Sequence, residues 1–193
     1  MADDASSSMD GPPDLLDSAR LVGGYAWLER RLFEVIGGWV ASTPEPAVAA
    51  LFDAHALHHA WYSSVFTDRL PHVREIVEDQ VVVAPDAGSA ALLDGLADGG
   101  TGTIERLSGT YRMVVPLLLV TYTDHLGRLT PVADEPLRRW LGMVITDLSA
   151  DWVAGESLLR SLVGTSAEVD RAVAVQARLE SILVASAGPS GPG

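Results

Sequence analysis

The amino-acid sequence predicts an all-α protein: an antiparallel four-helix bundle with a long crossover between helices 2 and 3, plus a short C-terminal helix. Two observations lead to this expectation. Apolar residues recur every three to four positions over four long segments, and the only competing strand signal, VVVA at residues 81–84, stands alone. Short breaks separate the first segment from the second and the third from the fourth, whereas residues 68–102 separate the second from the third.

The first helix is expected over residues 14–41, because five apolar residues follow a helical spacing from Leu21 to Trp39 and aspartates lie near its start. The sequence STPEP at residues 42–46 ends one helix and begins the next, since proline suits the first turn of a helix. The second helix is expected over residues 45–67. Its apolar side carries Val48, Leu51, Phe52, His55, Tyr62 and Phe66.

The long connection contains one expected short helix, at residues 90–97, and a glycine-rich end. The third helix is expected over residues 103–127, with a kink at Pro116 because proline removes a backbone donor. The fourth, over residues 134–164, is the most regular, and the last is expected over residues 166–185. The stripe of the fourth helix is formed by Leu137, Leu141, Val144, Leu148, Asp151, Gly155, Leu158 and Leu162.

The length of 193 residues suits one domain, which we place at residues 14–186 between tails at 1–13 and 187–193 that are expected to be disordered. The net charge of −13 repels nucleic acid and anionic lipid. The longest unbroken apolar segment, MVVPLLLV, is too short to span a bilayer, and no secretory signal is recognised at the start. We therefore expect a cytoplasmic protein without nucleic-acid or membrane partners.

The composition also excludes several kinds of chemistry. The sequence contains no cysteine and no lysine, and all 13 of its basic residues are arginine. Without cysteine there is no thiolate nucleophile, disulfide or cysteine-based metal site. Without lysine there is no Schiff base. The absence of asparagine as well as lysine indicates a high-GC genome.

A histidine cluster marks the second helix, where LFDAHALHHAWYSSVF carries three of the five histidines of the chain. His55 and His59 are one helical turn apart and share a face, and His55 falls among apolar neighbours. We expect His55 to point into the bundle and at least one of His58 and His59 to be partly exposed, because residues spanning one turn cannot all face one side.

Asp151 lies on the apolar stripe of the fourth helix, where an unpaired carboxylate would be costly. Its expected partners are His55, His59, the hydroxyl of Tyr122, or Glu29 through a metal. One interpretation is a purely structural contact between Asp151 and His55, since buried polar groups are usually satisfied.

Two other interpretations stay open. In one, a single metal is held by His55, His59 and a carboxylate from Asp151 or Glu29, because two histidines and one carboxylate form a known catalytic set. In the other, a histidine acts as acid or base in a small-molecule pocket. The candidates for lining that pocket are Tyr62, Tyr122, His125 and Asp147.

Three segments carry a resemblance to a known family. YAWLERRLFEVIGGWVASTPEPAVAALFDAHALHHAWYSSVFTDRLP is similar to the first helix pair of ferritin-like proteins of actinobacteria. ERLSGTYRMVVPLLLVTYTDHL and VADEPLRRWLGMVITDLSADWVAGESLL resemble their second pair. The resemblance covers residues 15–162 and implies a ferritin-like bundle.

The resemblance also implies a pattern for a dinuclear metal site: a Glu from each of two helices and Glu-x-x-His from each of the other two. This sequence departs from that pattern. Glu29 is present on the first helix, but the second offers histidines without a Glu, the third has no Glu after Glu105, and the fourth has Asp147 and Asp151 without a histidine. An iron pair would lack two of its expected ligands.

Two function classes follow. The favoured one is a ferritin-like binding or assembly module that has lost its dinuclear iron site, has no cofactor, and pairs with itself as a homodimer or with another protein. The segments GGWVAS and RRWLGMV are the candidate exposed-aromatic faces for that pairing. The alternative is a metal-dependent oxidoreductase or tailoring enzyme with iron or manganese in a reduced His/carboxylate site.

Overall fold

The computed structural model describes residues 15–99, 102–130 and 134–186, and within these ranges the chain is helical without any β-strand. The all-α prediction is therefore confirmed for this part of the chain. None of the helices in it is both long enough and apolar enough to cross a membrane. The elements in order are α1 (Leu15–Trp39), η1 (Val40–Ser42), α2 (Pro46–Thr67), α3 (Glu78–Val81), α4 (Ala87–Gly99), α5 (Thr103–Gly109), η2 (Thr110–Val114), α6 (Val115–Arg128), α7 (Glu135–Leu162) and α8 (Ser166–Ser186).

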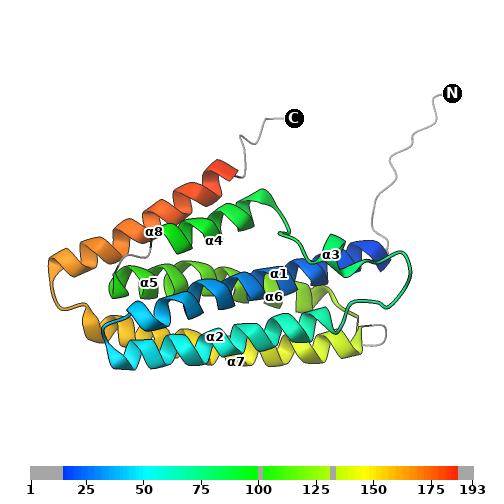
Figure 1. The fold of residues 1–193 in the computed structure, drawn as a ribbon, viewed down its shortest axis with the longest axis horizontal. Helices are drawn as coiled ribbons and strands as arrows, with labels where there is room; N and C mark the ends of the chain where they lie inside the picture. Colours follow the sequence, from blue (N-terminus) through cyan, green and yellow to red (C-terminus); the bar gives the residue numbers. More distant parts are fainter. Residues whose placement is uncertain (1–14, 100–101, 131–133, 187–193) are drawn as a thin grey trace.

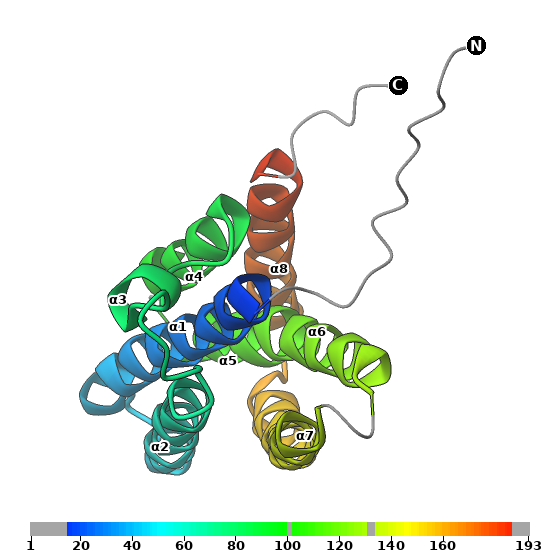
Figure 2. The same cartoon turned by 90° about the vertical axis from the view of Figure 1, so that its right-hand side faces the viewer.

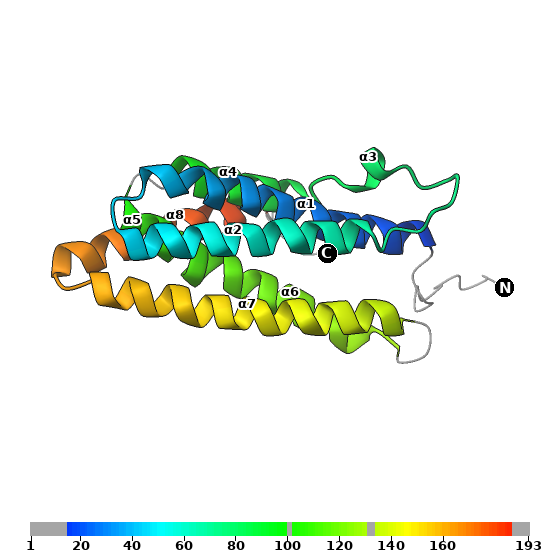
Figure 3. The ribbon, with the colours of Figure 1, turned by 60° about the horizontal axis from the view of Figure 1, so that its bottom comes forward.

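Four helical segments run along the length of the molecule (Figures 1 and 3). α1 and α2 form one antiparallel pair, and α5–α6 and α7 form another. α2 and α5–α6 run in the same direction, because the segment that contains α3 and α4 carries the chain back along the molecule between them. The bounds expected for the long helices agree with these elements to within about two residues, whereas α4 begins three residues before the helix expected at 90–97.

A third pair of helices covers the bundle. α4 and α8 lie together on the side of α1 and α5 that faces away from α2 and α7 (Figure 2). The bounds expected for the last helix, 166–185, are confirmed by α8, but with 21 residues it is nearly as long as α2 and is not a short helix. Only Ala172, Val175 and Leu179 are buried along α8. A stripe this narrow gives little sign in the sequence that the helix covers a whole face of the bundle.

The third long segment is continuous from Thr103 to Arg128 but changes its winding in the middle. η2 is a π-helical turn that ends two residues before Pro116. Pro116 has no N–H to bond the carbonyl four residues earlier, which lies inside η2, and a π turn accommodates such a gap in the hydrogen-bond ladder. The kink that the sequence predicts at Pro116 therefore takes the form of a π turn in the residues just before it, 110–114.

Large buried side chains fill the space between the two helix pairs. Many of them are aromatic and carry a polar atom, unlike the aliphatic residues that dominate most cores. The largest fully buried aromatic residues are Tyr62, Tyr111, Tyr122, Phe52 and Phe66. This arrangement places hydroxyl groups next to the buried histidines and carboxylates of the neighbouring helices.

Candidate functional site

Glu29 of α1 lies at the centre of a fully buried hydrogen-bonded group, with an exposed fraction of 0%. Its Oε2 lies 2.5 Å from Nδ1 of His59 in α2, and its Oε1 lies 2.5 Å from the hydroxyl of Tyr122 in α6. A carboxylate can only accept hydrogen bonds, so the histidine and the tyrosine both donate to it. Three helices are thereby joined through one side chain.

Tyr122 is held in its protonated form by this arrangement. Burial raises the pKa of Tyr122 well above its ordinary value, and the neighbouring charge of Glu29 raises it further. The hydroxyl therefore keeps the proton that it donates to Glu29. The group is a fixed set of donors around one acceptor.

Asp151 of α7 forms the second group. Its Oδ2 lies 2.8 Å from Nδ1 of His58, and its Oδ1 lies 3.2 Å from Nε2 of His55. The other ring nitrogen of His55, Nδ1, lies 2.7 Å from the hydroxyl of Tyr111. Since the carboxylate is an acceptor, His55 is best satisfied with its proton on Nε2 and with Nδ1 accepting from Tyr111.

The electrostatics of His55 agree with this neutral form. Burial lowers the pKa of His55 from 6.5 to about 4, although the nearby charge of Asp151 acts in the opposite direction. His58 has a side chain that is 47% exposed, so this group reaches the solvent, whereas the group around Glu29 does not. The two histidine rings are stacked, with centroids 5.7 Å apart.

A third pair joins Tyr25 of α1 to His125 of α6, with the tyrosine hydroxyl 3.1 Å from Nδ1. Burial raises the pKa of Tyr25 to about 12 and lowers the pKa of His125, so both groups are neutral near pH 7. The ring of Tyr25 also packs edge-on against Tyr122, with centroids 4.8 Å apart. The pair therefore adjoins the group around Glu29 through ring contact.

The four residues expected to line a small-molecule pocket make different contacts. Tyr122 bonds to Glu29 and His125 to Tyr25, while Asp147 lies exposed on α7. Tyr62 is buried, and its hydroxyl has no hydrogen-bond partner among the described residues. Burial and the surrounding carboxylates raise its pKa, so this hydroxyl stays protonated.

The residues present do not fit a dinuclear metal centre. The four candidate ligands are divided between two groups, Glu29 with His59 and Asp151 with His55. Within residues 15–99, 102–130 and 134–186, no three His, Cys, Asp or Glu side chains are grouped so that they could hold a metal ion. A single metal held by rearranged side chains stays a prediction.

Several expectations about individual residues are confirmed. His55 is buried, His58 is partly exposed, and Asp151 contacts His55. Sequence reasoning missed His58 as a partner of Asp151, because an exposed residue was not considered for a buried carboxylate. The side chain of Asp151 instead lies near the edge of the core, where both histidines reach it.

Tyr111 and Tyr25 were also missed. A spacing of three and four residues along the third helical segment would have placed Tyr111 on the same buried side as Tyr122 and His125. That spacing runs through Ile104, Leu107, Tyr111, Val114, Leu118, Tyr122 and His125, all of which are buried. The identity of the partners, in contrast, has no signal in the sequence.

The expectation of an exposed aromatic at GGWVAS was wrong. Trp39 is buried, packs against Phe52 with ring centroids 5.5 Å apart, and is covered by the guanidinium of Arg106. Trp39 ends α1 on its inward side, so the connection to α2 folds over it. In RRWLGMV, Trp140 is half-buried and packs against Trp61 of α2, with centroids 6.0 Å apart.

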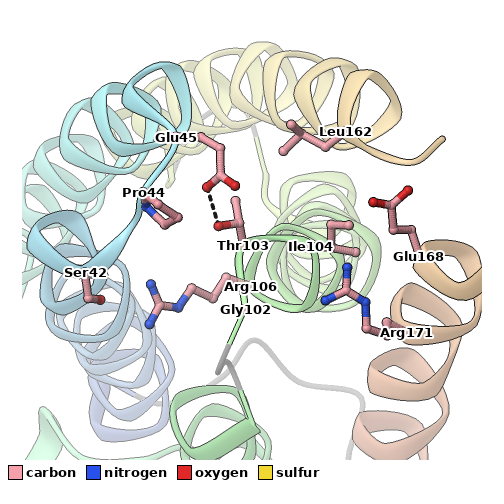
Figure 4. Close-up of a pocket in the computed structure, with 10 residues that line it drawn as sticks. All are labelled: Ser42, Pro44, Glu45, Gly102, Thr103, Ile104, Arg106, Leu162, Glu168 and Arg171. Carbon is pink, nitrogen blue, oxygen red and sulfur yellow. Dashed lines mark hydrogen bonds between the residues drawn. The ribbon is translucent and has the colours of Figure 1, made fainter. Parts of the chain in front are cut away.

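A polar pocket of about 440 Å³ lies at one end of the bundle (Figure 4). Glu45, just before α2, bonds to the hydroxyl of Thr103 at the start of α5, and Arg106 reaches toward the connection between α1 and α2. Glu168 and Arg171 of α8 form another wall. Because acidic and basic groups alternate around this pocket, its charge favours neither an anion nor a cation.

Comparison with known proteins assigns no relative to this chain. No protein-family model matches it, and neither a curated protein nor a solved structure gives a significant match. The ferritin-like resemblance therefore stays a prediction.

Proposed function

We propose that this chain is a ferritin-like helical bundle that works as a metal-independent binding module. The observation that carries the proposal is the pairing of the two core carboxylates. Each of the four oxygens of Glu29 and Asp151 lies 2.5–3.2 Å from a histidine nitrogen or a tyrosine hydroxyl of another helix. Here the polar core joins the helix pairs to one another.

The direction of the helices supports the ferritin-like part of the proposal. Bundles with one long crossover, in which the second and third helices run parallel, are the ferritin-like arrangement. α2 and α5–α6 run parallel here, with α3 and α4 in the crossover (Figure 1).

A metal ion would have to break these contacts before it could bind. Glu29 is fully buried, and losing a donor at a buried carboxylate costs more than the net gain of an ordinary hydrogen bond. The polar pairs also favour one register of the helices over others, which is the best-attested use of buried polar groups. A module with such a core presents fixed surfaces and pockets to a ligand.

The test is the metal content of the purified chain after expression with iron, manganese and zinc in the medium. We expect elemental analysis to find well below one ion per chain, and thermal unfolding to be unchanged by added Fe²⁺ or Mn²⁺. An ion that binds only the native state would raise the unfolding temperature by mass action.

A matched variant separates specific from adventitious binding. His72 is exposed and lies outside the buried groups. One ion per chain that is lost in Asp151→Ala or His59→Ala but kept in His72→Ala would overturn the proposal in favour of the metal-dependent oxidoreductase.

The proposed partners follow the same logic. Leu57 and Trp61 are exposed on α2, and Trp61 adjoins Trp140 of α7. A homodimer stays a prediction, and we propose this face for it in place of the one expected at GGWVAS. Light scattering of the wild type and of Trp61→Glu measures it, since a charge at the centre of such a face should give a monomer.

A further inference from the structure

A second cavity lies between α1, α4, α6 and α8, away from the carboxylates of the polar core. Its volume is about 480 Å³, within the usual range of small-molecule pockets. Most of its wall belongs to helices, and only Pro85 and Asp86 come from the connection before α4, so the space is largely formed before any ligand arrives. The walls include Leu28 and Leu32 of α1, Leu92 of α4, Leu117 and Leu118 of α6, and Leu183 of α8.

The hydroxyl groups of the lining are already engaged in hydrogen bonds. The hydroxyl of Thr121 donates to the carbonyl of Leu117, and that of Ser186 donates to the carbonyl of Ile182. The ring of Tyr25 contributes to the wall, but its hydroxyl is bonded to His125. The pocket therefore offers apolar surface and no strong polar anchor.

The charges around the cavity indicate which class of ligand it can bind. Among the described residues that line the cavity there is no arginine or histidine, and the chain contains no lysine. The single charged member is Asp86, which accepts hydrogen bonds from the backbone and the hydroxyl of Ser89 at 2.7 and 2.8 Å. A carboxylate or phosphate would find no cation here, and both Asp86 and the net charge of −13 would repel it.

The tails of the chain are poor occupants of this space. Residues 1–14 read MADDASSSMDGPPD and residues 187–193 read AGPSGPG. These 14 and 7 residues include no leucine, isoleucine, valine or aromatic residue. Their only large apolar side chains are those of Met1 and Met9, which give little surface to place against a leucine-lined wall. An external apolar molecule matches the wall better.

We propose that this pocket binds an uncharged, mainly aliphatic small molecule. The site is separate from Glu29 and Asp151. The proposal names the class of ligand that the binding module takes. It rests on the proposed function in one respect, namely that the chain binds a ligand. Removal of the apolar surfaces of ligand and wall from water provides the affinity.

The experiment uses the full chain and the neutral probe N-phenyl-1-naphthylamine, whose fluorescence rises in apolar surroundings. We expect saturable binding, displacement by 1-decanol, and displacement by decanoate that needs at least about tenfold higher concentration, equivalent to about 1.4 kcal/mol. Equal displacement by decanol and decanoate would overturn the assignment of an uncharged ligand.

Variants locate the site. Leu117→Trp and Leu183→Trp place a bulky ring in the cavity from two different helices, and each should weaken probe binding by at least about tenfold, equivalent to about 1.4 kcal/mol. Val153→Trp is the control, because Val153 is exposed on α7 outside the pocket, and it should leave binding unchanged. Circular dichroism checks that the variants fold, and two cavity variants guard against the failure of one.

The remaining outcomes are distinct. Absence of saturable binding, or equal binding in both cavity variants and the wild type, overturns the proposal. It is also overturned if light scattering shows a dimer that the cavity variants dissociate, because a second copy then covers the pocket. The metal analysis described above judges the binding module separately: a stoichiometric metal with normal probe binding would overturn that function and leave this pocket intact.

Discussion

Gly155 of α7 lies directly against the aromatic ring of Tyr111. A Cβ atom at position 155 would come within 2.3 Å of two ring carbons, closer than real contacts allow. The missing side chain lets the ring enter the space between α7 and η2, and its hydroxyl then reaches Nδ1 of His55 at 2.7 Å. One glycine thus positions a tyrosine that completes the group around Asp151.

Substituting this glycine tests the relationship. Gly142 lies on the same helix, and a Cβ atom there would meet nothing within 4 Å. Gly142→Ala should raise the free energy of unfolding by about 1 kcal/mol through helix propensity. Gly155→Ala gains the same stabilisation from helix propensity, but its new methyl group overpacks against Tyr111 at a cost of about 1–3 kcal/mol. It should therefore be less stable than Gly142→Ala by that amount. Urea unfolding of both variants gives the difference, and equal stabilisation would show that Tyr111 is not held against position 155.

Loss of Glu29 should be the most damaging single change in the polar core. Glu29→Ala leaves His59 and Tyr122 without their acceptor in a dry environment, and we expect a loss of about 3–5 kcal/mol in the free energy of unfolding. Glu29→Gln keeps the shape of the side chain, but its NH₂ group faces one of the two donors, His59 or Tyr122. The loss in the free energy of unfolding should be smaller, about 1–3 kcal/mol. Glu34→Ala, at an exposed position of the same helix, should leave stability nearly unchanged.

Asp151→Ala separates a structural role from a binding role. If the carboxylate serves to satisfy His55 and His58, its removal should lower the free energy of unfolding by about 1–3 kcal/mol. Asp147→Ala is the control, because Asp147 is exposed one turn earlier on α7. An increase in stability for Asp151→Ala would instead indicate a site that sacrifices stability for binding. Thermal melts with and without a divalent metal distinguish the two results.

Acid should weaken the fold through His55. The pKa of His55 is lowered from 6.5 to about 4 in the folded chain, so the unfolded chain binds more protons between these values. Stability is therefore fully present above pH 6.5 and falls as the pH drops toward 4, by at most about 3 kcal/mol from this residue. His55→Gln can still accept from Tyr111 and donate to Asp151 but cannot titrate.

The pH dependence of urea unfolding measures the contribution of His55. Between pH 6.5 and 4 the curve of His55→Gln should be flatter than that of the wild type. All other titratable groups are present in both proteins, so the comparison isolates His55. Parallel curves would show that His55 has an ordinary pKa in the folded chain.

Much of the secondary structure was predictable because helical periodicity is a local property. The four long helices were placed to within about two residues, and the same reasoning put His55 inside. The π turn was only partly predictable. Pro116 indicates an interrupted hydrogen-bond ladder, but whether the helix bends or widens depends on what packs against it.

By itself, the sequence determined that several polar residues lie on the buried sides of their helices. Glu29, His55, His59 and Asp151 lie on apolar stripes, and the stripe of each helix follows from spacing along the chain. Only the tertiary structure decided that Glu29 pairs with His59 while Asp151 pairs with His55 and His58. Such pairings depend on the axial shift between neighbouring helices, which no single helix encodes. The same reason applies to the leucine-lined cavity, since a space between four helices exists only once all four are in place.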